Sequence, residues 1–210
     1  MAKAYPFLKR ALDFLLSLGG LFALFPFFVL LVLLLVVDSP GPVFYVQERL
    51  TKGRKPFRIL KFRSMVPGAR DIQLAKGIHA DVLVTRFGRF LRNTHFDEFP
   101  QLFNVLLGDM SLVGPRPLMP NWVEERARLN PLTLKRFEVK AGMAGIERLL
   151  FLLQDDKEKL AAFFPDLVPY LSGNDLGYLD SYYVRHLSFW LDLRIFWLTF
   201  YMSLKRLLFG

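Results

Sequence analysis

The stretch from Phe14 to Val37 carries no charged side chain, and it constrains the fold more than any other feature of this 210-residue chain. As an α-helix it would extend about 36 Å, at roughly 1.5 Å per residue, which is enough for the hydrocarbon core of a bilayer. The run is too long for a cleaved signal peptide, and Val36-Val37-Asp38-Ser39-Pro40 offers no small-residue cleavage site. We therefore expect the segment to remain in the protein and to contact lipid.

Two features favour a re-entrant path for this segment. Basic residues flank it on both sides: Lys3, Lys9 and Arg10 before it, and Arg49, Lys52, Arg54 and Lys55 after it. The positive-inside bias draws both ends to the cytoplasmic side, which a single crossing cannot satisfy. Pro26 removes one helical hydrogen-bond donor and clashes with the preceding turn. Residues 1–40 are thus predicted to be a re-entrant helix-break-helix hairpin in one leaflet, with a kinked spanning helix as the alternative.

The positive charge of the chain is concentrated next to the apolar run. Lysine and arginine number 28 against 19 aspartates and glutamates, and residues 41–95 hold 12 basic and three acidic residues. Such a block is typical of proteins that meet anionic lipid head groups, phosphorylated ligands or nucleic acid, although a solvated charged surface is the simpler interpretation. The chain has no cysteine, which excludes disulfides, thiolate metal sites and cysteine nucleophiles.

The middle of the chain predicts a small α+β domain, mostly helical, over residues 41–185. Strands are expected at 43–46 and 57–62, joined by a hairpin at Lys52-Gly53. Helices are expected at 86–91, 100–107 and 121–129, with Gly108 in the position of a helix C-terminal glycine.

Residues 186–210 form a second apolar segment, rich in Trp, Phe and Leu, with Asp192 and Arg194 inside it. Charges at the centre of a bilayer are costly. We therefore predict an interfacial amphipathic helix with Trp190, Trp197 and Tyr201 at head-group level. A packed core helix fits the pattern equally well.

One acidic pair and one arginine stand out as candidates for chemistry. Pro100 suits the first turn of a helix and disfavours the α region for Phe99, so Asp97 and Glu98 are expected at a helix entrance, where they can converge. Helix N-termini also stabilise anions. Arg116 lies between two prolines, and an arginine on so stiff a turn is preorganised to bind phosphate. Taken alone, an acidic pair is more typical of a helix cap or a surface ion pair.

A series of further motifs extends over nearly the whole chain. In order they are Lys9-Arg10 with Asp13, Asp38-Ser39-Pro40-Gly41-Pro42-Val43-Phe44, Gln47-Glu48-Arg49, Lys61-Phe62-Arg63-Ser64-Met65, Asp97-Glu98-Phe99-Pro100-Gln101, Gly114-Pro115-Arg116-Pro117, Lys140-Ala141-Gly142-Met143-Ala144-Gly145, Asp180 to Tyr183 and Ser188 to Asp192. This series resembles the bacterial sugar transferase family, the monotopic phosphoglycosyl transferases that start lipid-linked glycan synthesis.

The resemblance implies an enzyme that moves a sugar-1-phosphate from a UDP-sugar to undecaprenyl phosphate and releases UMP. It implies that Asp97 is the nucleophile of a covalent aspartyl intermediate, with Glu98 as its catalytic partner. Mg²⁺ would be held by Asp97 and Glu98, and substrate phosphate would be bound by Arg92, Arg116 and Gln101. The same resemblance implies an inner-membrane protein with its active site on the cytoplasmic face.

The sequence departs from the family pattern at several positions. Phe25 precedes Pro26 where serine is usual, Ala141 and Ala144 replace Pro and Thr, Glu147-Arg148 replace Ala-Gln, and His95-Phe96 replace Ser-Leu. We interpret His95 as a packing or surface residue rather than a base. The alternative function is a non-catalytic peripheral membrane protein that binds anionic lipid. Nucleic-acid binding is not expected, because no known module for it is recognisable.

Overall fold

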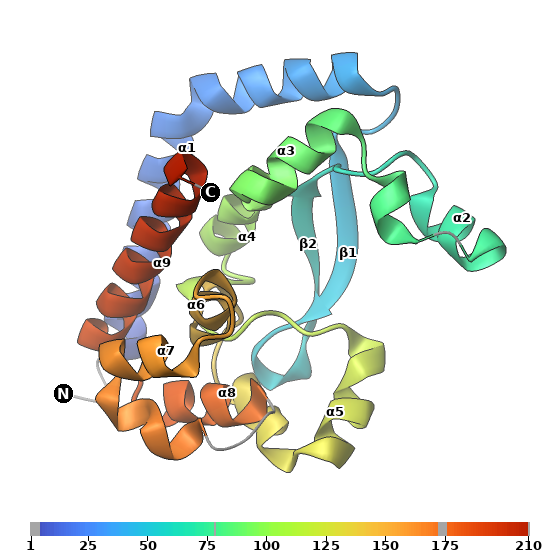
Figure 1. Ribbon diagram of the computed structural model, residues 1–210. Coiled ribbons are helices and arrows are strands. Elements are labelled where there is room, and N and C mark those ends of the chain that lie inside the picture. The colour runs from blue at the N-terminus through green and yellow to red at the C-terminus, as the bar shows by residue number, and fades with distance from the viewer. Residues whose placement is uncertain (1–4, 78, 172–175, 210) are drawn as a thin grey trace.

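The computed structural model describes residues 5–77, 79–171 and 176–209, and its architecture is mostly helical (Figure 1). Lys3 lies outside the described residues. The α-helices are α1 (Tyr5–Asp38), α2 (Ala69–Lys76), α3 (Arg86–Thr94), α4 (Gln101–Leu107), α5 (Val123–Leu129), α6 (Ile146–Leu152), α7 (Lys157–Phe163), α8 (Leu176–Arg185) and α9 (Phe189–Phe209). The strands are β1 (Phe44–Leu50), β2 (Pro56–Phe62), β3 (Ser111–Val113) and β4 (Gly142–Ala144). Short 3-10 helices are η1 (Lys52–Arg54), η2 (Ala80–Leu83), η3 (Phe96–Glu98), η4 (Pro120–Trp122), η5 (Pro131–Glu138) and η6 (Pro165–Tyr170).

The strands form two small sheets. β1 and β2 pair in an antiparallel hairpin that sets Tyr45 opposite Lys61, and Gly53 turns the chain with a φ of 69°. This confirms the predicted hairpin and its turn. β3 and β4 form a parallel pair between segments about thirty residues apart, with Val113 opposite Ala144. The second pair was not predicted, because neither strand is longer than three residues.

Helix α1 remains helical through Pro26 and bends over the body of the protein (Figure 1). The predicted break is therefore a bend, because a proline removes one hydrogen bond and redirects a helix without ending it when both halves are packed. The buried side of α1 is polar before Pro26 and apolar after it. It carries Asp13 and Ser17 before the proline, and Phe28, Leu31 and Leu35 after it.

The outer side of α1 is exposed in the part of the chain that the structure describes. Within the described ranges, α1 is the one helix long and apolar enough to cross a membrane, and 11% of its most apolar 18-residue window is buried. Phe22 and Phe25 are 85% and 64% exposed. An apolar surface of this extent indicates a non-aqueous partner.

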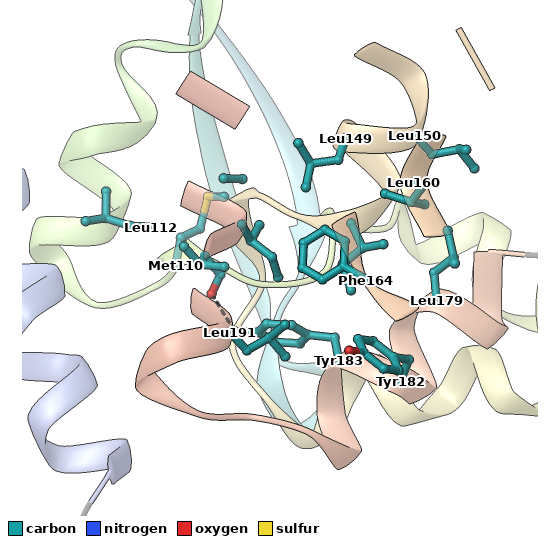
Figure 2. Packing of buried hydrophobic residues seen from close by; sticks show 14 of the residues in the cluster. Met110, Leu112, Leu149, Leu150, Leu160, Phe164, Leu179, Tyr182, Tyr183 and Leu191 are labelled. Atoms are coloured by element: carbon teal, nitrogen blue, oxygen red, sulfur yellow. Dashed lines mark hydrogen bonds between the residues drawn. The ribbon is translucent and has the colours of Figure 1, made fainter. Parts of the chain in front are cut away.

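The described residues form three apolar clusters, of which the two larger ones position the acidic pair and the third joins Leu118, Val123 and Phe137. The larger of those two packs β3, β4, α4, α6, α7, α8 and α9 around Met110, Leu149, Phe164 and Ile195, and Figure 2 shows much of it. The smaller of those two joins the second half of α1 to β2 and α3 through Phe28, Phe62 and Leu91. Because these two clusters include residues adjoining η3 and α4, they fix the position of Asp97 and Glu98.

Helix α9 packs one side into the core, as the core-helix alternative predicts, and leaves the other side exposed, while its predicted position at a membrane interface stays a prediction. Leu191 and Ile195 belong to the larger core cluster, whereas Trp190 and Trp197 are 74% and 64% exposed. Asp192 is buried and is paired with Lys9 at the start of α1, which explains how an apolar helix accommodates a central charge.

Candidate active site

Asp97 and Glu98 lie in the single turn η3, between α3 and α4. Phe99 was expected to leave the α region, and this was wrong: its φ and ψ are −55° and −36°. Its amide bonds to the carbonyl of Phe96, and the two rings lie 4.9 Å apart, so local packing outweighs the steric preference set by Pro100. The acidic pair still precedes a helix, and both residues are buried.

Glu98 is enclosed by cations. Its Oε1 accepts hydrogen bonds from Lys61 Nζ at 2.9 Å and from Arg116 Nη2 at 3.0 Å, and its Oε2 pairs with Arg148. Burial raises its pKa, but the attraction of Lys61, Arg116 and Arg148 exceeds that effect and holds the pKa well below its usual range. Glu98 is therefore ionised and serves to bring three basic side chains to one point.

Asp97 is buried like Glu98 but lacks its contacts with basic side chains. It is 9% exposed and makes no hydrogen bond or ion pair with any residue that the structure describes. Burial, followed by the charge of Glu98, raises its pKa to about 6, and Lys61, Arg148 and Arg92 offset part of this. Near neutral pH Asp97 is thus an ionised carboxylate with no direct partner, which is the state a nucleophile requires.

An open cleft of about 750 Å³ leads to the acidic pair. Its walls come from β1, β2, the segment 63–69, the C-terminal end of α3 and the turn around Arg116. Of the predicted phosphate-binding residues, Arg92 and Arg116 line this cleft. Gln101 is buried at the start of α4 and is not among the lining residues. The structure therefore brings Asp97, Glu98, Arg92 and Arg116 together and leaves Gln101 behind them.

The turn that carries Arg116 is held in place by arginine side chains that donate hydrogen bonds to its backbone carbonyl groups. Arg49 Nη1 donates to the carbonyl of Pro117 at 3.2 Å, and Arg136 Nη1 donates to the carbonyl of Arg116 at 3.4 Å. Arg49 is itself bonded to Gln47 at 2.7 Å. Because prolines supply no amide hydrogens, side-chain donors to these carbonyls take over the role of backbone bonding.

Arg136 is fixed in turn by Asp180, to which its Nε donates at 2.9 Å. The side chains of this pair are 2% and 4% exposed. A buried arginine with a single carboxylate partner keeps one direction, so it can support the turn above it.

A close backbone approach between Gly114 and Gly142 also holds the Arg116 turn in place. A Cβ atom on Gly142 would lie 2.0 Å from the nitrogen of Gly114. Only glycine permits these two backbone segments to approach so closely, and the contact fixes the position of the Arg116 turn relative to β4.

Four site residues had no role assigned from the sequence: Lys61, Arg148, Arg49 and Arg136. Strand alternation could have located Lys61, because it shares a face of β2 with the buried Phe57 and Ile59. Arg148 lies in α6, fifty residues from Glu98, and no local pattern links them.

His95 lines the cleft and ends α3 in a left-handed conformation, with a φ of 61°. Its ring contacts Phe151 edge-on at 6.3 Å, as expected of a packing residue. Burial, then the nearby charge of Arg148, lowers its pKa to about 4. Its Nε2 is buried and has no hydrogen-bond partner in the described part of the chain.

The carboxylates allow a test of the expected Mg²⁺. Among residues 5–77, 79–171 and 176–209 there is no group of three or more His, Asp or Glu that could hold a metal ion. Mg²⁺ often takes one or two carboxylates and completes its shell with water and substrate phosphate, so such a group is not required. Asp97 has free oxygens for this purpose, whereas both oxygens of Glu98 already accept from basic side chains.

Comparison with known proteins gives a family match over nearly the whole chain. Residues 4–206 match the family model described as bacterial sugar transferase. The chain is 33% identical, over 93% of its length, to a UDP-N-acetylgalactosamine-undecaprenyl-phosphate N-acetylgalactosaminephosphotransferase of Aeromonas hydrophila. It is 34% identical, over 91%, to a UDP-glucose:undecaprenyl-phosphate glucose-1-phosphate transferase of Klebsiella pneumoniae.

These relatives differ in length. The chain spans 43% of the Aeromonas protein and 39% of the Klebsiella protein. It is 36% identical to the exopolysaccharide production protein PSS of Rhizobium leguminosarum bv. phaseoli, over 95% of this chain and 96% of that protein.

Proposed function

The chain belongs to the bacterial sugar transferase family, and on that premise we propose that it transfers a sugar-1-phosphate from a UDP-sugar to undecaprenyl phosphate and releases UMP. The observation that carries the proposal is the contrast within the acidic pair. Glu98 gathers three cations, and Asp97 stands beside them, ionised and without a partner among the described residues. This is an environment for a nucleophile that must meet a negatively charged phosphate.

The charge balance of the site fits a diphosphate. Lys61, Arg92, Arg116 and Arg148 surround two carboxylates. After Asp97 and Glu98 are counted, two positive charges remain, which a UDP-sugar diphosphate would neutralise. Arg116 is well placed to bind one phosphate group, because its side chain is 45% exposed while its backbone is fixed.

In the first step a carboxylate oxygen of Asp97 attacks the β-phosphorus. A bond forms between this oxygen and phosphorus, and the bond from phosphorus to the bridging oxygen breaks with its electron pair going to UMP. No proton is required, because the nucleophile is ionised and UMP leaves as a stable anion. Lys61, Arg92 and Arg116 offset the repulsion between the reacting anions.

In the second step an oxygen of the lipid phosphate attacks the same phosphorus. The bond to Asp97 breaks, the carboxylate is regenerated, and the product is a polyprenyl diphosphosugar. The two displacements balance in atoms and charge without an external acid or base. The relatives named for N-acetylgalactosamine and glucose transfer support a UDP-hexose or a UDP-N-acetylhexosamine as the sugar donor.

We further propose that Mg²⁺ assists this reaction. When bound, the ion would neutralise charge on the diphosphate oxygens, and the unpartnered carboxylate of Asp97 is the group that could hold it together with substrate. Glu98 acts here through the basic residues that it orients.

We also propose that α1 is re-entrant and that the reaction takes place at the cytoplasmic face of the inner membrane. Both ends of α1 bond to the same globular body. Near its start, Lys9 donates to the carbonyl of Val113 at 2.9 Å, and at its end Asp38 accepts from the amide of Phe87 at 3.1 Å. A helix that crossed a bilayer would place these two contacts on opposite sides.

Activity is tested by incubating the purified protein with a UDP-sugar, Mg²⁺ and undecaprenyl phosphate. We expect UMP release for at least one of UDP-N-acetylgalactosamine, UDP-glucose and UDP-galactose. Without the lipid, we expect one equivalent of UMP and a covalent adduct with the mass of a sugar phosphate. Chelation of Mg²⁺ should suppress both. UMP release that is unchanged in Asp97→Asn would remove Asp97 from this role.

Topology is tested with single cysteines, since the chain has none of its own. Cysteines placed at the exposed positions Ala11 and Pro40 should react with an impermeant reagent from the same side of inverted membrane vesicles. Reaction from opposite sides would establish a spanning helix.

A further inference from the structure

A second basic position lies close to the acidic pair, on the side of α9. The C-terminal end of α9 lies beside α3 (Figure 1), and the two helices are in contact. There the guanidinium of Arg206 sits over the ring of Phe151, 5.5 Å from its centre. Phe151 in turn contacts His95, two residues before Asp97. Arg206 is thus linked to the acidic pair by two ring contacts.

Arg206 has no assigned partner. Among the described residues it makes no hydrogen bond or ion pair, whereas Arg116 and Arg148 are both paired with Glu98. Stacking on an aromatic ring orients a guanidinium while leaving its donors free for a bidentate anion. The buried and unpartnered Nε2 of His95 adds a polar group on the same path.

This position is separate from the cleft that leads to Asp97. None of the cleft-lining residues in the described ranges belongs to α6 or α9. A water-soluble UDP-sugar can enter through the cleft. Of the series Arg206, Phe151 and His95, only His95 lines that cleft, so Arg206 and Phe151 lie outside the route that a UDP-sugar would take.

The surroundings of Arg206 point to a lipid. On α9, Tyr201, Leu204 and Leu208 are 53%, 41% and 63% exposed. Phe22 and Phe25 present a similar apolar surface on α1. A basic side chain among exposed apolar side chains is expected at head-group depth, with its charge directed to a phosphate.

We propose that Arg206, stacked on Phe151, binds the phosphate of the polyprenyl-phosphate acceptor as it leaves the lipid plane for Asp97. The inference rests on the proposed function and adds a separate entry site for the second substrate. It makes Arg206 a residue of the second step, with no part in the first.

The test uses Arg206→Gln, with the neighbouring Lys205→Gln as its matched control. Both positions are exposed and basic, so the two substitutions remove the same charge from the same helix end. The variants of the 210-residue chain are placed in phosphatidylcholine nanodiscs, one set without and one set with undecaprenyl phosphate. The stoichiometric UMP release without acceptor and the KM for acceptor are measured separately.

We expect Arg206→Gln to raise the KM for undecaprenyl phosphate roughly five- to tenfold, as loss of about 1 kcal/mol or somewhat more of binding would produce. The UMP burst and the KM for UDP-sugar should be unchanged, and Lys205→Gln should resemble the parent protein. Phe151→Leu should raise the acceptor KM in the same direction, because it removes the platform on which the guanidinium is stacked.

An unchanged acceptor KM in Arg206→Gln would overturn the proposal. So would an equal effect in Lys205→Gln, or a defect confined to binding of phosphatidylglycerol vesicles that lack the acceptor, since either result would indicate general attraction to anionic lipid. Failure of the proposed function is distinguishable, because the parent protein would then release no UMP.

Discussion

Glu98 forms ion pairs with three basic side chains, and Asp97, its neighbour in the same turn, forms none with any residue that the structure describes. The chain thus divides two adjacent carboxylates between two roles. Glu98 orients the basic side chains. Asp97 makes no ion pair with them but is acted on by their positive charge. Since the two share one burial environment, the difference comes from the contacts of each side chain.

Replacement of Asp97 by asparagine should stabilise the protein while abolishing activity. The pKa of Asp97 is raised from 3.8 to about 6, so the folded state binds its proton more tightly than the unfolded state. This contribution to stability is present below the unfolded pKa and is lost as pH rises through the folded pKa. At pH 7.5 Asp97→Asn should therefore raise the unfolding free energy by roughly 1–3 kcal/mol. Thermal unfolding in detergent measures this, and a lower Tm would contradict the assigned environment.

The pH dependence of the first half-reaction should report the same group. UMP release without acceptor requires ionised Asp97, so kcat/KM for the UDP-sugar should fall as pH decreases through about 6. His95 does not produce this limb, because its pKa is lowered to about 4. The control is His95→Gln, which should keep the acid limb. A profile that is flat between pH 5 and 7 would count against Asp97 as the titrating nucleophile.

Replacement of Glu98 by glutamine should be strongly destabilising. A neutral amide leaves three buried or half-buried cations uncompensated, and loss of one member of such a group costs roughly 3–5 kcal/mol. The exposed pair Glu138 and Lys135 provides the control, and Glu138→Gln should cost less than about 1 kcal/mol. Glu98→Gln should also move the acid limb of UMP release to lower pH, because the charge of Glu98 raises the pKa of Asp97. An unshifted limb would show that the two carboxylates act independently.

Local rules accounted for much of the fold. The hairpin of β1 and β2 follows from alternating side chains and a Lys-Gly turn, and Gly108 has the expected positive φ, at 93°. The predicted helices at 86–91, 100–107 and 121–129 correspond to α3, α4 and α5. These elements are determined by residues close together in the sequence, which is why the sequence pattern predicted them.

Features that depend on distant contacts were not predicted. Phe99 keeps helical angles because Phe96 and Phe27 pack on it, and no rule about the residue before proline includes Phe27. The third cation on Glu98 comes from Arg148, a position identified in the sequence only as a departure from the family pattern. The acidic pair and Arg116 were found because they lie in compact motifs, whereas the residues that orient them lie in other helices and strands.

The stiffness of the Arg116 turn gives the last prediction. Arg49 bonds at once to the carbonyl of Pro117 and to Gln47, and its fixed fork of donors makes both contacts possible. Lysine keeps the charge but has no such fork, so Arg49→Lys should let the turn move. We expect kcat for UMP release to fall about tenfold, since about 1.4 kcal/mol of positioning energy would be lost.

Rates should be expressed per covalent adduct formed, so that unfolded protein is not counted. Arg58→Lys is the matched control, because Arg58 is an exposed residue of the paired strand and lies opposite Glu48 rather than the turn. It should leave the normalised rate unchanged. If Arg49→Lys did the same, Pro115 and Pro117 alone would account for the orientation of Arg116, and the carbonyl contacts would be structural without affecting the chemical step.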